Sequence, residues 1–185
     1  MPLIPYADIE KLPDDVREAF DRLPRKLNIF RMCANADTLY RPAMRLGGAI
    51  LGRQQLGASL RELVILLVAR IEGGTYEWVQ HVPIAETAGC RKEQIDAIEK
   101  SDIAAACFDA REKALLAFAA DVIRNVAASE DKVKAASEHF SPKEIVEIIL
   151  TCGFYMMMAR LTETTRVDVD GPGGTAVLES LTKMR

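Results

Sequence analysis

One short stretch of the chain, residues 76–83, gathers most of the side chains that could carry out chemistry. It reads Tyr-Glu-Trp-Val-Gln-His-Val-Pro and contains the single tryptophan, Trp78, and one of the two histidines, His81. Glu77 lies four residues before His81, so on a helix the two side chains project from the same face and can share a proton. A carboxylate beside an imidazole fixes the ring tautomer, which general acid–base catalysis requires. The spacing therefore predicts an acid–base pair.

Two aromatic side chains in this stretch would supply flat apolar surface beside the pair, and we expect Tyr76 and Trp78 to bind substrate. Pro83 removes one backbone donor and should bend the helix that carries them. The alternative is an ordinary surface Glu–His pair worth a few tenths of a kcal/mol, with Trp78 in the core. Spacing alone does not separate these two interpretations.

Glu62 is a third candidate acid, and it also has two explanations. It ends the sequence Ser59-Leu60-Arg61-Glu62, which has the pattern of a capping box, in which the Glu bonds back to the Ser amide. The helix that follows, residues 60–71, is apolar on nearly all sides and should lie in the middle of a domain. A carboxylate in its first turn could therefore also face the interior, so Glu62 is a cap, a catalyst or both.

The second histidine and the cysteines indicate no further site. His139 lies at the end of a helix, where a histidine favours the helix dipole. No two of the four cysteines are spaced as Cys-x-x-Cys, and we expect them to be buried small hydrophobes: Cys33, Cys90, Cys107 and Cys152. Phosphate-loop, dinucleotide and zinc-protease motifs are absent from the sequence. We therefore expect neither a cofactor nor a metal.

Every periodic segment has helical spacing, which predicts an all-α fold. The expected helices cover residues 12–23, 38–56, 60–71, 75–88, 91–99 and 109–126, a short one from 129 and a last one from 141. Capping-box sequences begin at Asp109 and Ser141, and Pro142 is suited to a first helical position. The chain after Thr165 is rich in turn-forming residues, so we expect one domain over residues 1–170 and a C-terminal tail over 171–185.

The composition restricts the class of protein further. The 185 residues are 49% hydrophobic, which is enough to bury the core of one domain. A net charge of −3 offers no basic field to attract nucleic acid or anionic lipid. The longest nearly uncharged run, Ile148–Ala159, is too short to cross a bilayer, and the N-terminus lacks a secretory signal. We expect a cytoplasmic protein with no membrane or nucleic-acid partner.

The two segments that carry the candidate site resemble those of a known family. Leu-Arg-Glu-Leu-Val-Ile-Leu at residues 60–66, and residues 76–85 followed by Ala88-Gly89, are similar to the carboxymuconolactone decarboxylase family, which also contains the alkylhydroperoxidase D-like proteins. The resemblance covers roughly residues 10–169. It implies an all-α fold and a homo-oligomer, a trimer or hexamer assembled through helical faces.

The chain departs from the peroxidase members of that family at their reactive thiols. Those members carry Cys-x-x-Cys-x-x-x-His-x-x-x-Ala, with a glutamate about nineteen residues before the histidine. Here His81 and Ala85 match the motif, and Glu62 stands nineteen residues before His81. The two cysteine positions are occupied by Gly74 and Glu77, so the thiolate and the resolving thiol that peroxide reduction needs are both missing.

The Glu-x-x-x-His spelling is similar to the decarboxylase branch of the family. The resemblance implies a cofactor-free lyase or isomerase of aromatic compound catabolism, acting on a small ring-derived carboxylic acid or lactone. In this interpretation His81 is the general acid/base, Glu77 orients and charges it, and Glu62 is a second proton carrier or an orienting group. An anionic substrate would also need a cationic anchor, for which the candidates are Arg53, Arg70 and Arg160.

Two other functions stay open at the level of sequence. One is the thiol peroxidase activity of the wider family, which the missing dithiol disfavours. The other is a non-catalytic helical oligomer that binds an apolar or aromatic ligand.

Overall fold

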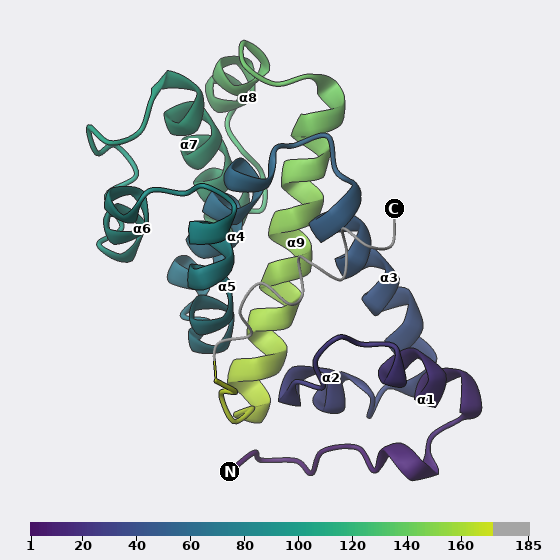
Figure 1. The fold of residues 1–185 in the computed structure, drawn as a ribbon. Coiled ribbons are helices and arrows are strands. Elements are labelled where there is room, and N and C mark those ends of the chain that lie inside the picture. The colour runs from purple at the N-terminus through teal and green to yellow at the C-terminus, as the bar shows by residue number, and fades with distance from the viewer. Residues whose placement is uncertain (172–185) are drawn as a thin grey trace.

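Helix α9 (Pro142–Thr165) runs through the centre of the protein (Figure 1). Helices α4 (Ala58–Glu72) and α5 (Thr75–Thr87) lie along one side of it, and α3 (Asp37–Arg53) lies on the other. The computed structural model describes residues 1–171. Within these residues all regular secondary structure is helical. The predicted all-α fold is confirmed. The predicted tail, residues 171–185, lies outside the described residues except for Gly171.

The other helices lie around this central group. The remaining elements are η1 (Ile9–Lys11), α1 (Asp14–Asp21), α2 (Asn28–Cys33), α6 (Lys92–Glu99), α7 (Ala110–Asn125) and α8 (Glu130–Ser137). The N-terminal elements α1 and α2 lie at one end in Figure 1, α7 and α8 lie toward the other, and α6 lies on the far side of α5 from α9. The sequence analysis did not predict η1 and α2. These helices have only three and six residues, and no side-chain cap marks the start of either one.

Helix α4 is the buried centre of the main hydrophobic core. Every residue from Leu60 to Ala69 is buried, as the apolar run on all its faces predicts. The helix packs against α5, α6, α7 and α9. It ends at Gly73, whose φ of 72° is a left-handed conformation that suits glycine, and Gly74 then precedes the first residue of α5. This tight connection sets α5 beside α4.

The side-chain caps behave as predicted at two helices and differently at a third. Asp109 caps α7, and Ser141 caps α9 with Pro142 in first position, and both form complete capping boxes. The capping box predicted at Ser59 is wrong: α4 begins at Ala58 after Gly57, so Ser59 already lies inside the helix. Glu62 consequently stands in the second turn of α4 and faces the interior.

Helix α9 is long and apolar enough, by length and composition alone, to cross a membrane. The sequence analysis judged this segment too short to cross a bilayer because it counted only the nearly uncharged run Ile148–Ala159. A window that allows two charged residues extends over 18 residues of α9. Buried core helices pass the same test, and 44% of this window is buried inside the protein. In the structure α9 packs along α4, α5 and α7.

The cap at Ser141 predicts a measurable share of stability. The Ser141 side chain accepts a hydrogen bond from the Glu144 amide, so Ser141→Ala should lower the free energy of unfolding by about 1 kcal/mol. Ser129→Ala is the matched control, because the Ser129 hydroxyl caps no amide of α8 and donates only to Asp121 at the surface, so the variant should lose only a few tenths of a kcal/mol. Urea denaturation of both variants measures the difference. Equal losses would show that the Ser141 cap contributes nothing specific.

Candidate active site

The site is built where α4 and α5 face each other, around the carboxylate of Glu62. His81 Nδ1 lies 2.8 Å from Glu62 Oε2, and the two residues are only 8% and 0% exposed. A carboxylate can only accept a hydrogen bond, so the ring proton is assigned to Nδ1 and Nε2 is the atom that can exchange a proton. The structure thus places Glu62, and not Glu77, at the imidazole.

Arg61 completes this buried chain of charges. Its Nε and Nη2 donate to Glu62 Oε1 at 3.1 and 3.0 Å, so one carboxylate is shared between a guanidinium and an imidazole. Arg61 is only 4% exposed. The sequence analysis did not select it, because neighbouring residues on a helix usually point to different sides and their spacing suggests no pairing. The signal that was available is an arginine inside an otherwise apolar run.

Glu77 is also buried, but its partner is on α9. Both of its carboxylate oxygens lie 3.1 Å from Thr162 Oγ1, which is also 3.2 and 3.1 Å from the backbone carbonyls of Met158 and Ala159. Burial raises the pKa of Glu77, and hydrogen bonds from its own backbone and Thr162, with the charge of His81, offset this only in part. The Thr162 hydroxyl can donate to the ionised acid, or accept from the protonated acid and donate to the helix.

Glu77 fills the space beside Gly74. A Cβ atom at residue 74 would lie 2.7 Å from Glu77 Oε2 and 3.0 Å from the Ala159 Cβ. The first distance is shorter than real contacts allow, so a side chain at 74 requires Glu77 to move. These are the two positions at which the peroxidase motif has cysteines. The structure shows that glycine at one and glutamate at the other are a matched pair.

The cysteines lie outside this pair, and three of them are held in the thiol form by burial. Burial raises the pKa of Cys33, Cys90 and Cys152 to about 12, so these thiols stay protonated at neutral pH. Cys90 donates to the backbone carbonyl of Ser59 at 3.3 Å. The prediction of buried cysteines is confirmed for Cys90 and Cys152, whereas Cys33 and Cys107 are only half-buried, and all four are free.

The two aromatic residues predicted to bind substrate lie on different parts of α5. Tyr76 donates its hydroxyl to Asp170 Oδ2 at 2.5 Å, and Gln80 Nε2 donates to the Asp170 carbonyl at 2.9 Å. These bonds hold the end of the described chain against α5. Trp78 is half-buried against the main core. Substrate binding by Tyr76 and Trp78 stays a prediction, and the Tyr76 hydroxyl already has a partner within the protein.

Tyr155 on α9 is a further neighbour that the sequence analysis did not select as a site residue. Its ring meets the His81 ring edge-on, with centroids 4.9 Å apart and planes at 90°. Burial raises the pKa of its hydroxyl well above the usual value, and the charge of Glu62 adds to this while that of Arg61 opposes it. The phenol therefore stays protonated and can donate a hydrogen bond.

The three arginines proposed as cationic anchors are placed elsewhere. Arg70 donates to the carbonyl of Glu99 at 2.6 Å, and Arg160 is paired with Glu72 at 2.8 Å, while Arg53 is exposed at the end of α3. Neither Glu99 nor Glu72 belongs to the group around Glu62. The structure brings Arg61 to that place instead.

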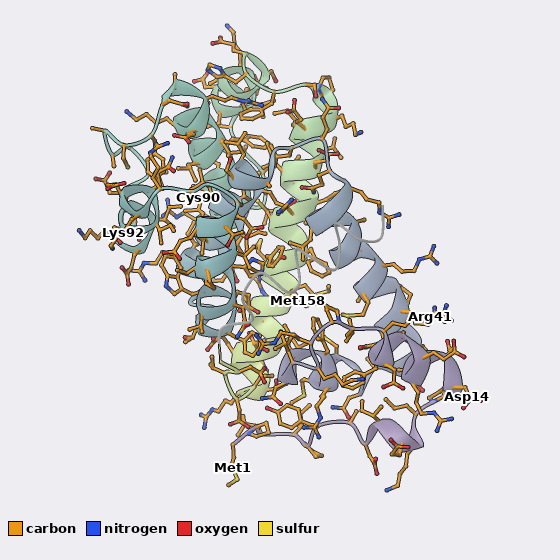
Figure 2. All side chains as sticks on the ribbon, in the orientation of Figure 1. Met1, Asp14, Arg41, Cys90, Lys92 and Met158 are labelled. Carbon is orange, nitrogen blue, oxygen red and sulfur yellow. The ribbon has the colours of Figure 1, made fainter. Side chains whose placement is uncertain are left out.

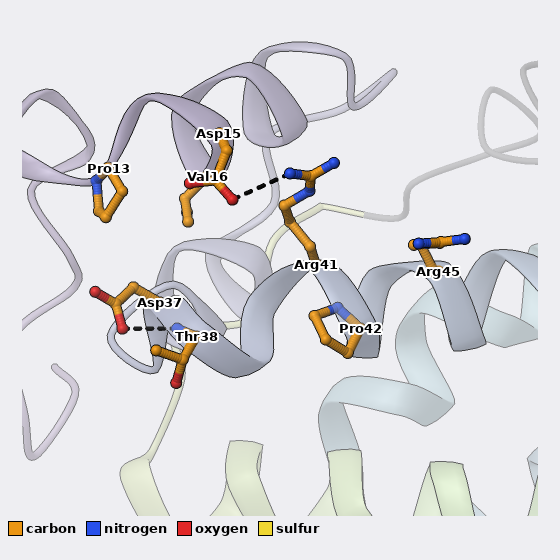
Figure 3. Close-up of a pocket in the computed structure, with 8 residues that line it drawn as sticks. All are labelled: Pro13, Asp15, Val16, Asp37, Thr38, Arg41, Pro42 and Arg45. Carbon is orange, nitrogen blue, oxygen red and sulfur yellow. Dashed lines mark hydrogen bonds and ion pairs between the residues drawn. The ribbon is translucent and has the colours of Figure 1, made fainter.

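Two described cavities lie away from this group. The larger, of about 610 Å³, is an open groove between α1 and α3 lined by Pro13, Asp15, Val16, Asp37, Thr38, Arg41, Pro42 and Arg45 (Figure 3). A smaller apolar one of about 170 Å³ lies among α7, α8 and α9. In Figure 2 the groove residue Arg41 lies on one side of α9 and Cys90 lies on the other. Within residues 1–171 no group of three or more His, Cys, Asp or Glu side chains is arranged to hold a metal.

A comparison with protein families matches the carboxymuconolactone decarboxylase family over residues 37–121, which include Glu62, Glu77 and His81. The chain is a member of the carboxymuconolactone decarboxylase/AhpD-like superfamily. No curated protein sequence matches it. The match to the family model covers the α4–α5 pair and both positions of the peroxidase thiols.

Solved structures of this superfamily share the fold. The AhpD-core, uncharacterized peroxidase-related protein from Ralstonia eutropha JMP134 is 21% identical with a TM-score of 0.78, over 97% of this chain and 96% of its own. A peroxidase-related protein from Silicibacter sp. TM1040 is 22% identical with a TM-score of 0.77, over 91% and 92%. The debrominase Bmp8, solved with 2,3,4-tribromopyrrole, is 15% identical with a TM-score of 0.73, over 99% and 97%. At these identities the similarity shows the fold alone.

The burial of Glu77 predicts a pH dependence of stability with a defined sign. Because its pKa is higher in the folded protein than in the unfolded chain, where it is about 4.3, the folded state binds more protons in the interval between the two. The free energy of unfolding should therefore fall as pH rises through that interval. Glu77→Gln removes this contribution, so the variant should gain stability over the natural protein as pH rises from 4 to 7 in urea denaturation.

Glu144 provides the control of opposite sign. Its pKa is lowered by the backbone hydrogen bond from Ser141, so it contributes stability above its unfolded pKa that is lost as pH falls. Glu144→Gln should be destabilising at neutral pH and progressively less so in acid. If both variants shift in the same direction, the assignment of Glu77 as an uncompensated buried acid is wrong.

The contact between Gly74 and Glu77 predicts non-additive stability changes. Gly74→Ala should lower the free energy of unfolding by about 1–3 kcal/mol through overpacking, and by less when Glu77→Ala is also present. Gly153→Ala is the matched control, because Gly153 is exposed on α9 and a Cβ there meets nothing within 4 Å, so the variant should gain up to about 1 kcal/mol. A double-mutant cycle measures the coupling, and an additive cycle would contradict it.

Proposed function

We propose that this superfamily member is a cofactor-free acid–base enzyme, a lyase or isomerase of the decarboxylase type, acting on a small ring-derived carboxylic acid or lactone. One observation carries the proposal: His81 is fixed through Nδ1 by the buried Glu62, while its Nε2 has no hydrogen-bond partner within residues 1–171. An imidazole held in one tautomer by a carboxylate is arranged to move a proton at its other nitrogen.

The proton balance of such a reaction fits these residues. Loss of carbon dioxide from a β,γ-unsaturated acid breaks one carbon–carbon bond and leaves its electron pair in a dienolate. The dienolate must then gain a proton at the far carbon, and the protonated His81 delivers it from Nε2. Glu62 stabilises the imidazolium before this transfer, and a proton from water or Glu77 restores it afterwards.

Glu77 supplies the second titrating group that this chemistry needs. Its raised pKa keeps it protonated to a higher pH than an exposed glutamate, and Thr162 can bond to either protonation state. Acid–base sites commonly place two titrating groups in environments that separate their pKa values. We infer that Glu77 acts as a proton donor, and that Glu62 orients His81.

The observations weigh against a thiol peroxidase. The dithiol positions hold Gly74 and Glu77, and burial raises the pKa of Cys90 to about 12. A neutral thiol is a poor nucleophile toward a peroxide bond. The complex of Bmp8 with a brominated pyrrole supports a different expectation, a small planar ring as ligand of this fold.

The homo-oligomer is part of the same proposal. Four large apolar side chains on α9 are exposed in the single chain, and a partner copy would cover them: Val146, Ile149, Leu150 and Met157.

Turnover of 4-carboxymuconolactone tests the proposal through release of carbon dioxide. His81→Ala should lower kcat by about 100-fold or more, and Glu62→Gln and Glu77→Gln by lesser factors, while the helical circular dichroism is kept. His139→Ala is the control, since His139 is exposed after α8 and away from the site. Undiminished turnover in His81→Ala, or saturable ring-ligand binding without any product, would contradict the proposed function.

A further inference from the structure

The C-terminal part of α9 meets the first turn of α5 at two polar contacts. Glu163 accepts a hydrogen bond from the backbone amide of Thr75 at 2.8 Å, and Thr162 Oγ1 lies 3.1 Å from both carboxylate oxygens of Glu77. Thr162 and Glu77 are only 2% and 3% exposed. Two adjacent residues of α9 therefore hold the start of α5 and the buried acid that it carries.

The Thr162 hydroxyl has more acceptors within reach than it has protons to donate. Besides the two Glu77 oxygens, the backbone carbonyls of Met158 and Ala159 lie 3.2 and 3.1 Å from Oγ1. A hydroxyl carries one proton and two acceptor lone pairs, so it cannot donate fully to all of these groups. The direction of its hydrogen bond therefore depends on whether Glu77 carries a proton.

Each protonation state of Glu77 has its own arrangement of this hydroxyl. When Glu77 is ionised, Thr162 donates to the carboxylate, because a hydrogen bond to a charged acceptor is stronger than one to a neutral carbonyl. When Glu77 is protonated, the acid donates to Oγ1, and the hydroxyl donates to the carbonyl of Met158 or Ala159. The buried acid thus keeps a partner in both states, and rotation of one hydroxyl is enough to exchange them.

We propose that Thr162 is the positioning residue of Glu77: it holds the carboxyl group in one place and reverses its hydrogen bond whenever Glu77 releases or takes up a proton. The inference rests on the proposed function, in which Glu77 is a proton donor. A donor that is fixed and hydrogen-bonded in both states needs little rearrangement during proton transfer. Thr162 acts through Glu77, and its role requires no contact with the substrate.

The other titratable groups around Glu77 do not replace this bond. Burial raises the pKa of Glu77, and the hydrogen bonds from its own backbone and from Thr162 oppose this more strongly than the charge of His81 does, while Glu163 raises it. Three further groups feel the charge of Glu77 and stay neutral at neutral pH, because burial raises their pKa values: Cys33 on α2, Tyr76 on α5 and Tyr155 on α9.

The ionisation of Glu77 in the resting, full-length protein tests this role without any turnover. Thr162→Val keeps the branched shape but removes the hydroxyl, so the ionised acid loses a donor and its ionisation constant should fall about 10-fold. Thr162→Ser keeps the hydroxyl and should behave like the natural protein. Infrared titration of the carboxyl band measures the constant, and loss of that band in Glu77→Gln assigns it. Thr162→Ala gives the same test if the Val variant does not fold.

Thr165→Val is the matched control on the same helix. The Thr165 hydroxyl donates to the Leu161 carbonyl at 2.7 Å, four residues back, as Thr162 can donate to Met158. Its removal should leave the ionisation of Glu77 unchanged. The proposal is overturned if loss of the Thr162 hydroxyl leaves the ionisation constant of Glu77 unchanged, if Thr162→Ser shifts it as much as Thr162→Val, or if Thr165→Val shifts it equally.

The pH dependence of turnover separates this inference from the proposed function. Because a proton donor must be protonated, kcat should fall as Glu77 ionises, and Thr162→Val should move this fall to higher pH. A shifted ionisation of Glu77 in a protein that releases no carbon dioxide would support the role of Thr162 and contradict the decarboxylase. Turnover that depends on His81, with the same pH profile in Thr162→Val, would support the enzyme and overturn the inference.

Discussion

The fully buried carboxylate of Glu62 is the interaction on which the site depends. Burying an unpaired carboxylate costs several kcal/mol, so the protein must keep Arg61 and His81 against it. Arg61 lies beside Glu62 on α4, but His81 comes from α5, and the bond therefore fixes how the two helices pack. The same contact that orients the imidazole also secures the centre of the hydrophobic core. A change that loosens α4 against α5 would alter structure and chemistry together.

Two buried glutamates have opposite surroundings, and the acid–base roles proposed for them rest on this difference. Glu62 is bonded to a guanidinium and an imidazole, which favour its charge. Glu77 has a hydroxyl, Thr162, in place of a cation, and burial raises its pKa. One acid can therefore stabilise positive charge on His81 while the other holds a proton. The two residues are both glutamates, so the difference comes from their partners: Glu62 meets His81 of α5, and Glu77 meets Thr162 of α9.

Sequence reasoning located the long helices and three residues of the candidate site, Glu62, Glu77 and His81, but it missed Arg61 and how these side chains pair. Helix starts at Asp109 and Ser141 are local signals, since a cap bonds within its own first turn, and both are confirmed. The i, i+4 rule describes contacts within one helix, so it joined Glu77 to His81. The hydrogen bonds in the structure instead run between helices, from Glu62 to His81 and from Thr162 to Glu77. Such partners depend on packing, which spacing along one element does not contain.

The replacement of the dithiol is best understood as a change of chemistry within one volume. A side chain at residue 74 would crowd the carboxylate of Glu77 beside Ala159, so a thiol at 74 requires Glu77 to move from its present position. Glu62 and His81 serve either arrangement, because a fixed imidazole can move a proton from a thiol or from a carbon acid. With Gly74 and Glu77 in place of the two cysteines, the volume beside His81 holds a buried acid where the peroxidase motif has thiols.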